Sequence, residues 1–208
     1  MKLTVRASET RQLMTSGDKI TATTLTWLKE KAVAQVLGIT TFVATKQMTK
    51  GLDCEQTSID LLNAVMFEDF KKNSDRIEKN GFTGSWDILK YNVIRDIKTS
   101  WSASTFPFFQ DDAEQAVKKS GYDWQMRVYM MLTGADVAFV DYCLITTPEE
   151  LLTDWDDWEL HHVDHIPITK RVTSVRIERD LEIEQKMLDK YELANTLYQG
   201  FIHELNNK

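Results

Sequence analysis

The stretch GSWDILKYNVIRDIKT, residues 84–99, predicts two short strands joined by a tight turn near Tyr91-Asn92. Side chains alternate between the two faces of a strand, so Asp96 and Lys98 are expected to point the same way. Ile94 and Ile97 are expected to point more nearly into the core. Because Asp87 is expected on the first strand, the hairpin brings two carboxylates and an ammonium group to one region of a sheet.

The polar groups of this hairpin indicate a binding site. Two carboxylates and an ammonium group are expensive to gather on one sheet face unless a metal ion or a phosphate lies among them. The segment is therefore a candidate site for metal-assisted phosphodiester cleavage. Taken singly, Asp87 is more typical of a turn or sheet edge, and Lys98 of a solvated edge strand.

The composition is that of a globular chain: 208 residues, 42% apolar and 27% charged. It contains no apolar run of the roughly 18 residues that a membrane span needs, and residues 1–6 do not resemble a signal peptide. The expected location is therefore the cytoplasm, of the host cell if a phage encodes the protein, with no membrane partner. Cys54 and Cys143 are expected to be unpaired and packed as small apolar residues.

Charge is distributed unevenly. The net charge is −7, yet residues 1–50 carry eight Lys and Arg against three Asp and Glu. Many of the acids lie in 149–159, which is expected to form a solvated acidic loop. Trp155 and Trp158 within it are expected to anchor the loop or lie in an interface, and its acidity argues against a zinc site at His161, His162 and His165.

The remaining pattern predicts an α/β arrangement, a central mixed sheet flanked by helices. Helices are expected from Ser8 to about 14, from 23 or 24 to Gly38, and from just after Gly51 to about 72, with a loop at 15–18. Two more are expected at 111–119, closed by Gly121, and at 122–132, closed by Gly134. Strands are expected within 76–100 and at 135–145 and 172–177. Apolar spacing from 177 to 205 predicts a long C-terminal helix.

Three further residues join the hairpin. Glu55 lies on the apolar stripe of the helix expected after Gly51, where a lone carboxylate is unusual. Gln125 and Tyr129 are four residues apart on one helix and therefore share a face. Singly, Glu55 could be an acid at a helix N-terminus and the other two a surface pair, but together they offer groups for a metal ion or a phosphate.

The order Glu55, Asp87, Asp96-Ile97-Lys98, Gln125-x-x-x-Tyr129 resembles the PD-(D/E)xK nuclease superfamily. Within it, the match is closest to lambda-exonuclease-like (YqaJ-type) viral recombinase nucleases. The segments that carry the resemblance are KGLDCE (50–55), GSWDIL (84–89), IRDIKT (94–99) and YDWQMRVY (122–129). The resemblance implies one nuclease domain over 1–208, with a restriction-endonuclease-like core at about 4–145 and a C-terminal extension over 146–208.

The resemblance also implies roles for these residues. Glu55, Asp87, Asp96 and the backbone carbonyl of Ile97 would hold one or two Mg²⁺ ions, for which Mn²⁺ can substitute. Lys98 would orient or help deprotonate the attacking water. Gln125 and Tyr129 would position the water or the scissile strand. Oxygen ligands suit Mg²⁺, and a pair of ions can activate water and stabilise the leaving oxygen.

The chain departs from the family pattern at two places. The chain has Trp86 where the superfamily name places Pro, and no arginine lies about seven residues before Ser8. Ser8 and Thr99 are weaker candidates for contact with DNA. The expected partners are double-stranded DNA ends, a single-strand-annealing protein and further copies of the chain, in a ring or trimer.

The expected activity is digestion of double-stranded DNA from an end, in phage-type recombination. Two alternatives remain open from the sequence. One is a non-catalytic DNA-binding or scaffold protein with the same fold, against which the intact carboxylate and lysine set argues. The other is a repair or restriction-type endonuclease of the same superfamily.

Overall fold

The computed structural model describes residues 1–15, 19–40 and 43–207, so most of the loop expected at 15–18 lies outside the described residues. Its strands form two mixed sheets. A three-stranded sheet has the order β1-β3-β2, where the strands are β1 (Val5–Arg6), β2 (Ile77–Lys79) and β3 (Phe82–Gly84). A four-stranded sheet follows the chain: β4 (Ile88–Lys90), β5 (Val93–Thr99), β6 (Val137–Cys143) and β7 (Val172–Glu178).

Helices surround both sheets. The long ones are α2 (Ala22–Leu37), α4 (Glu55–Met66), α5 (Gln110–Ser120), α6 (Tyr122–Thr133) and α8 (Leu181–Asn206). Shorter α-helices are α1 (Thr10–Leu13), α3 (Lys46–Asp53) and α7 (Trp158–His161). Single 3-10 turns are η1 (Ala7–Glu9), η2 (Ala103–Thr105), η3 (Glu149–Leu151) and η4 (Ile168–Lys170). The expected α/β fold with a long C-terminal helix is confirmed.

The four-stranded sheet carries an apolar core on each face. In β5 and β6, even-numbered apolar residues such as Ile94 and Val140 join a large cluster that includes residues of α6. Odd-numbered residues such as Ile97 and Cys143 join a smaller cluster with Ile59 and other residues of α4. Ile94 and Ile97 are therefore both buried, as expected, but on opposite faces. A sheet covered on both sides accounts for the nearly continuous apolar run of its inner strand β6, VAFVDYC.

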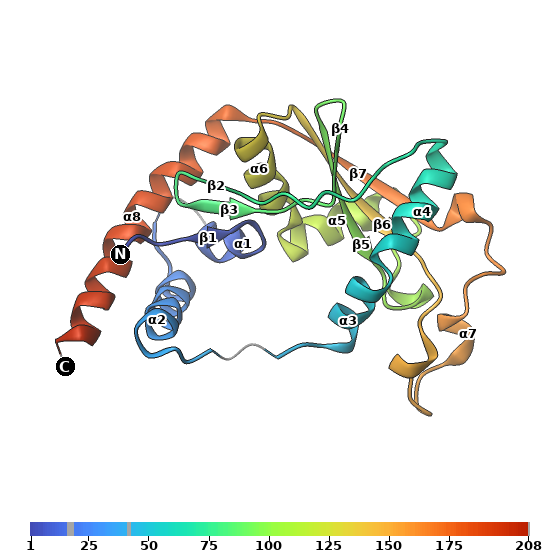
Figure 1. Cartoon of the computed structure of the whole chain (residues 1–208), viewed down its shortest axis with the longest axis horizontal. Coiled ribbons are helices and arrows are strands. Elements are labelled where there is room, and N and C mark those ends of the chain that lie inside the picture. Colours follow the sequence, from blue (N-terminus) through green and yellow to red (C-terminus); the bar gives the residue numbers. More distant parts are fainter. Residues whose placement is uncertain (16–18, 41–42, 208) are drawn as a thin grey trace.

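The strands expected within 76–100 belong to two different sheets, because β2 and β3 pair within the three-stranded sheet and are joined by a tight turn at Asn80-Gly81. Asn80 and Gly81 both have positive φ, 54° and 78°, which is the conformation of a type I′ hairpin turn. A Cβ atom at Gly81 would lie only 2.0 Å from the Tyr191 ring of α8. Tyr191 Oη also donates a hydrogen bond to Leu3 O. Helix α8 therefore contacts both the turn of this sheet and the N-terminal segment (Figure 1).

Two expected helix boundaries are wrong. The helix expected from 51 to about 72 is two helices: α3 starts earlier, behind the N-cap Thr45, and α4 ends at Met66, where Phe67 takes a left-handed φ of 56°. The break at Cys54 leaves Leu52 74% exposed, although its spacing placed it on the buried stripe. Ser8 does not cap the first helix, because it lies inside η1 and Glu9 accepts from the backbone N–H of Arg6 instead.

Two features of the described residues concern membrane spanning and the cysteines. No helix in 1–15, 19–40 or 43–207 has the length and apolar character that crossing a bilayer requires. Cys54 and Cys143 are both unpaired and buried.

A buried ion pair joins three strands on the α4 side of the sheet. Arg95 Nη1 of β5 lies 2.8 Å from each carboxylate oxygen of Asp141 on β6. Ser174 Oγ of β7 donates a further hydrogen bond to Asp141. Asp141 is fully buried, and the guanidinium carbon of Arg95 lies 4.3 Å from the Phe139 ring centroid. The pair therefore links β5, β6 and β7 away from solvent.

Replacing Asp141 with alanine is expected to lower the free energy of unfolding by about 3–5 kcal/mol, because it leaves a buried guanidinium without a partner. Urea denaturation at neutral pH measures this change. The matched control is Glu178→Ala, which breaks the ion pair between Glu178 and Arg176. The side chain of Glu178 is 75% exposed and that of Arg176 is 56% exposed. That control is expected to change stability by no more than about 1 kcal/mol. Similar losses in both variants would contradict the role given to Asp141.

Candidate active site

The turn of the expected hairpin is where the sequence placed it. Tyr91 and Asn92 both have positive φ, 52° and 60°, and they join β4 to β5 in antiparallel register. Asp87 lies one residue before β4 rather than within it. The type I′ turn matches the right-handed twist of the two strands and holds Asp87 beside the middle of β5.

Asp96 and Lys98 point to the same face, as the alternation in β5 predicts. Lys98 Nζ lies 2.5 Å from Asp96 Oδ2, and Asp96 is only 3% exposed. Lys98 Nζ also lies 4.3 Å from the ring centroid of Tyr122, the first residue of α6. Burial by itself would lower the pKa of Lys98, but the charges of Asp96 and Asp87 outweigh it and raise the pKa. Lys98 is therefore held as an ammonium group against two carboxylates.

Asp87 is tied to the same strand through the backbone. Its Oδ2 accepts a hydrogen bond from the N–H of Ile97 at 2.5 Å. Burial raises the pKa of Asp87 to about 7, and the neighbouring charge of Asp96 adds to that rise. A buried carboxylate whose pKa is raised by a neighbouring carboxylate is a feature of sites that hold a cation or share a proton.

Gln125 and Tyr129 complete the face, and both are buried. Gln125 Nε2 lies 2.7 Å from Tyr129 Oη and 3.4 Å from Asp96 Oδ1. Burial and the charge of Asp96 raise the pKa of Tyr129, so it stays a neutral phenol. The interpretation of these two residues as a surface pair is therefore wrong. Helix α6 presents them to the carboxylate of Asp96.

Glu55 belongs to α4, which packs on the face of the four-stranded sheet opposite to α6. It is the first residue of α4, and its carboxylate pairs with Lys72 at 2.5 Å. Its charge contributes to the raised pKa of Asp87. Because α3 ends just before it, Glu55 is an acid at a helix N-terminus, where the helix dipole favours a negative charge. It does not lie within a continuous apolar stripe.

The donor groups fit a hard divalent cation. Asp96 Oδ2 is buried and, besides its ion pair with Lys98, has no hydrogen-bond partner in the described part of the chain. No three His, Cys, Asp or Glu side chains among the described residues are arranged to enclose a metal ion by themselves, and Glu55 is turned to Lys72. Mg²⁺ needs only one or two carboxylates because it keeps several waters. Asp87, Asp96 and the carbonyl of Ile97 are such a set.

The weaker DNA-contact candidates lie outside this cluster. Ser8 is exposed on η1, and no hydrogen bond among the described residues joins it to the carboxylates. Thr99 Oγ1 lies 2.9 Å from Ser58 Oγ, so it connects β5 to α4. Sequence reasoning missed Lys72, the partner of Glu55. The basic pair Lys71-Lys72, a few residues after the end of α4, was the available signal.

The acidic loop differs in part from its expected form. Trp155 is 96% exposed, so it does not anchor the loop, whereas Trp158 stacks on His162 with centroids 3.5 Å apart. His161 is buried and its Nδ1 lies 2.9 Å from Thr147 Oγ1. Among the described residues, His161, His162 and His165 belong to no group of three or more potential metal ligands.

Comparison with solved structures finds the same arrangement of elements. The crystal structure of a phage related exonuclease from Haemophilus somnus 129PT is 32% identical, with a TM-score of 0.94, and the match covers 99% of this chain and 97% of that chain. The alkaline exonuclease LHK-Exo from Laribacter hongkongensis is 18% identical, with a TM-score of 0.67 and coverage of 98% and 92%. Its complex with dAMP matches with a TM-score of 0.64 at 19% identity. Searches of family models and of curated proteins find no match.

Gly84→Ala is expected to disturb the site and lower the free energy of unfolding by about 1–3 kcal/mol. The added Cβ would lie 2.7 Å from the ring of Tyr129, which therefore has to move away from its position beside Gln125. Chemical denaturation measures stability, and the near-ultraviolet circular dichroism of Tyr129 and Trp86 reports the shift. In the control Gly200→Ala, on α8, the new Cβ meets nothing within 4 Å. That variant is expected to be stabilised by up to about 1 kcal/mol; equal destabilisation of both would refute the close packing at Gly84.

Proposed function

The chain belongs to the lambda-exonuclease-like nucleases of the PD-(D/E)xK superfamily, and we propose that it is a Mg²⁺-dependent deoxyribonuclease that digests double-stranded DNA from an end. One observation carries the proposal: the fold places Asp87, Asp96, Lys98 and Gln125 on one face at the hairpin. The relative that shares 32% of the sequence over nearly its whole length is described as a phage related exonuclease.

Each side chain has a role that its surroundings support. Asp87 and Asp96, with the carbonyl of Ile97 and with Glu55 once it leaves Lys72, are the oxygen donors for Mg²⁺. The cation would supply positive charge at the scissile phosphate. Lys98, held charged by the carboxylates, orients the attacking water and offsets charge that develops on the phosphorus.

Gln125 and Tyr129 orient the reacting groups. Gln125 Nε2 already donates toward both Asp96 and Tyr129, so its amide oxygen remains for a water or a backbone group. The neutral phenol of Tyr129 is a donor as well as an acceptor. Because both side chains are buried, they are held in place before DNA arrives, which favours positioning over induced fit.

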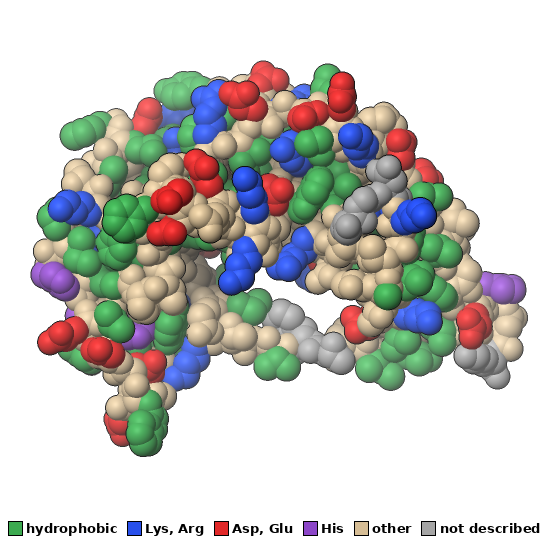
Figure 2. All heavy atoms as spheres, turned by 180° about the vertical axis from the view of Figure 1, so that it is seen from behind, with side chains coloured by type: hydrophobic (Ala, Val, Ile, Leu, Met, Phe, Trp, Pro, Cys, Tyr) green, Lys and Arg blue, Asp and Glu red, His purple; other side chains and the backbone are tan. Residues whose placement is uncertain are grey.

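Local positive charge supports DNA as the substrate despite the net charge of −7. The segment that joins α4 to β2 carries the exposed residues Lys71, Lys72 and Arg76, of which Lys72 pairs with Glu55. Figure 2 shows Lys and Arg side chains bordering the hollow in the middle of one face of the molecule. Such groups contact the phosphate backbone and fix its position without reading sequence. Ser8 and Thr99 remain candidates for further contacts with the DNA.

The biological setting is proposed by family resemblance. The exonuclease would act in phage-type recombination, leaving single strands for an annealing protein. A homo-oligomer, as a ring or trimer that encircles DNA, would suit digestion from an end.

Asp96→Asn is expected to reduce Mg²⁺-dependent digestion of linear duplex DNA by more than about 10²-fold, because the amide removes a metal-binding charge and the partner of Lys98. Release of acid-soluble nucleotides measures the rate, and circular dichroism verifies folding. The exposed Asp112 on α5 offers the control Asp112→Asn, which is expected to keep full activity. A folded Asp96→Asn protein with undiminished activity would overturn the site assignment. Activity of the wild type in excess EDTA would remove the metal requirement.

Linear and circular substrates distinguish the exonuclease from the endonuclease alternative. Linear duplex DNA is expected to be degraded, whereas covalently closed circular DNA of the same sequence is expected to stay intact under identical conditions. Cutting of the circle would favour a repair or restriction-type endonuclease. Binding of linear DNA without release of nucleotides at any Mg²⁺ or Mn²⁺ concentration would favour the non-catalytic scaffold.

A further inference from the structure

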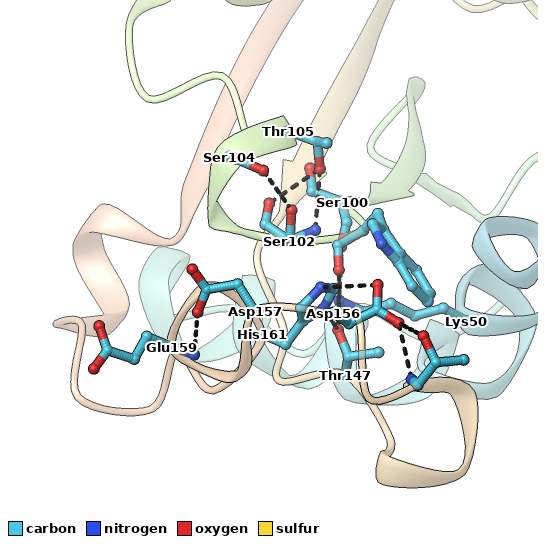
Figure 3. A network of polar contacts seen from close by, with 12 residues as sticks. Lys50, Ser100, Ser102, Ser104, Thr105, Thr147, Asp156, Asp157, Glu159 and His161 are labelled. Atoms are coloured by element: carbon cyan, nitrogen blue, oxygen red, sulfur yellow. Dashed lines mark hydrogen bonds and ion pairs between the residues drawn. The ribbon is translucent and has the colours of Figure 1, made fainter.

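Lys50 of α3 is a charged residue in the interior that has no role in the site described above. It is fully buried, and its ammonium group is surrounded by oxygen atoms (Figure 3). The acceptors are Ser100 O at 2.7 Å, Trp101 O at 2.9 Å, Ile145 O at 2.7 Å and Thr147 Oγ1 at 2.9 Å. Burial lowers the pKa of Lys50 to about 8, and the four acceptors favour its charged form.

These acceptors lie at the ends of the two central strands. Ser100 and Trp101 follow β5 directly, two residues beyond Lys98, and Ile145 and Thr147 follow β6. Thr147 continues the network to His161, whose ring meets Trp101 edge-on at 5.1 Å between centroids. The ammonium group therefore joins α3 to both strand ends and to the segment that carries the acidic loop (Figure 3).

The same helix pair carries Glu55. Lys50 O accepts from Cys54 N at 2.9 Å across the break between α3 and α4, and Glu55 follows at once. On the far side of Glu55, Ser58 Oγ lies 2.9 Å from Thr99 Oγ1 of β5. Two polar links, at Lys50 and at Ser58, thus fasten the helix break to the strand that carries Asp96 and Lys98.

Packing alone does not require a charge at this position. A buried ammonium group is expensive to desolvate, and an apolar side chain of similar length would fill the space without that cost. The ammonium group instead fixes the position of α3, because it has to lie within hydrogen-bond distance of acceptors at two separate strand ends at once. A residue that is costly for stability and demanding in geometry is typical of support for a functional site.

We propose that Lys50 is a positioning residue of the nuclease site, which sets where Glu55 stands relative to Asp87 and Asp96. The inference rests on the proposed function. Lys50 touches none of the reacting groups, so its effect passes through the helix break to Glu55. Its removal is expected to weaken Mg²⁺ binding rather than the chemical step at saturating Mg²⁺.

The test compares Lys50→Met with wild type in two measurements. The first is binding of MgCl₂ to the protein alone, followed by calorimetry and by the rise in melting temperature. The second is the Mg²⁺ concentration that gives half-maximal digestion of linear duplex DNA. Lys50→Met is expected to weaken Mg²⁺ binding about 10–100-fold in both, the range seen when the supporting partner of a metal ligand is lost, while most of the rate returns at saturating Mg²⁺.

Three further variants make the result specific. Lys46→Met removes an exposed lysine one turn earlier on α3 and is expected to match wild type. Leu28→Ala truncates a buried residue of α2 and reports the effect of lower stability alone. Thr147→Val removes one of the four acceptors and is expected to weaken Mg²⁺ binding in the same direction but less, so it decides the question if Lys50→Met fails to fold.

The outcomes separate the two proposals. If wild type binds Mg²⁺ and digests DNA, and Lys50→Met or Thr147→Val weakens Mg²⁺ binding well beyond Leu28→Ala, the positioning role stands. If wild type binds Mg²⁺ and digests DNA, but Lys50→Met and Thr147→Val bind Mg²⁺ no more weakly than Leu28→Ala, Lys50 is only structural and the inference is overturned. If wild type shows neither Mg²⁺ binding nor digestion, the proposed function fails and this inference with it.

Discussion

Strand β5 is hydrogen-bonded on both sides, to β4 and to β6, and the arrangement of the site depends on that constraint. A strand paired on both edges cannot slip by one residue without turning every side chain to the opposite face. The register therefore points Asp96 and Lys98 toward α6 and Arg95 toward α4. It also leaves the N–H of Ile97, next to the end of β4, for the carboxylate of Asp87.

Three buried charged groups surround this strand, and each is stabilised differently. Arg95 and Asp141 neutralise each other through an ion pair in which one guanidinium nitrogen reaches both carboxylate oxygens, which suits a structural role. Lys50 donates to four neutral oxygen atoms, which suits a directional link between segments. Asp96 pairs with Lys98, while burial and the charge of Asp96 raise the pKa of the neighbouring Asp87 to about 7. Two buried carboxylates so close together favour the binding of a proton or a cation between them.

Local rules in the sequence predicted the hairpin well and the helix around Glu55 poorly. Tyr91-Asn92 lies between two β-rich runs, and a two-residue turn there fits the strand twist without help from distant residues. The break at Cys54 has no such signal, because Leu52, Ile59 and Leu62 keep helical spacing across it. The buried Lys50 is bound there by strand ends that lie fifty or more residues away along the chain. A contact of that kind overrides local periodicity.

The sequence by itself determined which chemical groups are available and how neighbours along one element face: Asp96 with Lys98 on a strand, Gln125 with Tyr129 on a helix. These follow from fixed backbone periods of two and 3.6 residues. Only the tertiary structure decided that both pairs meet, that Asp87 bonds to Ile97, and that Glu55 pairs with Lys72. Those contacts join segments far apart in the chain, and they exist because packing of α6 and α4 on opposite faces of one sheet brings the segments together.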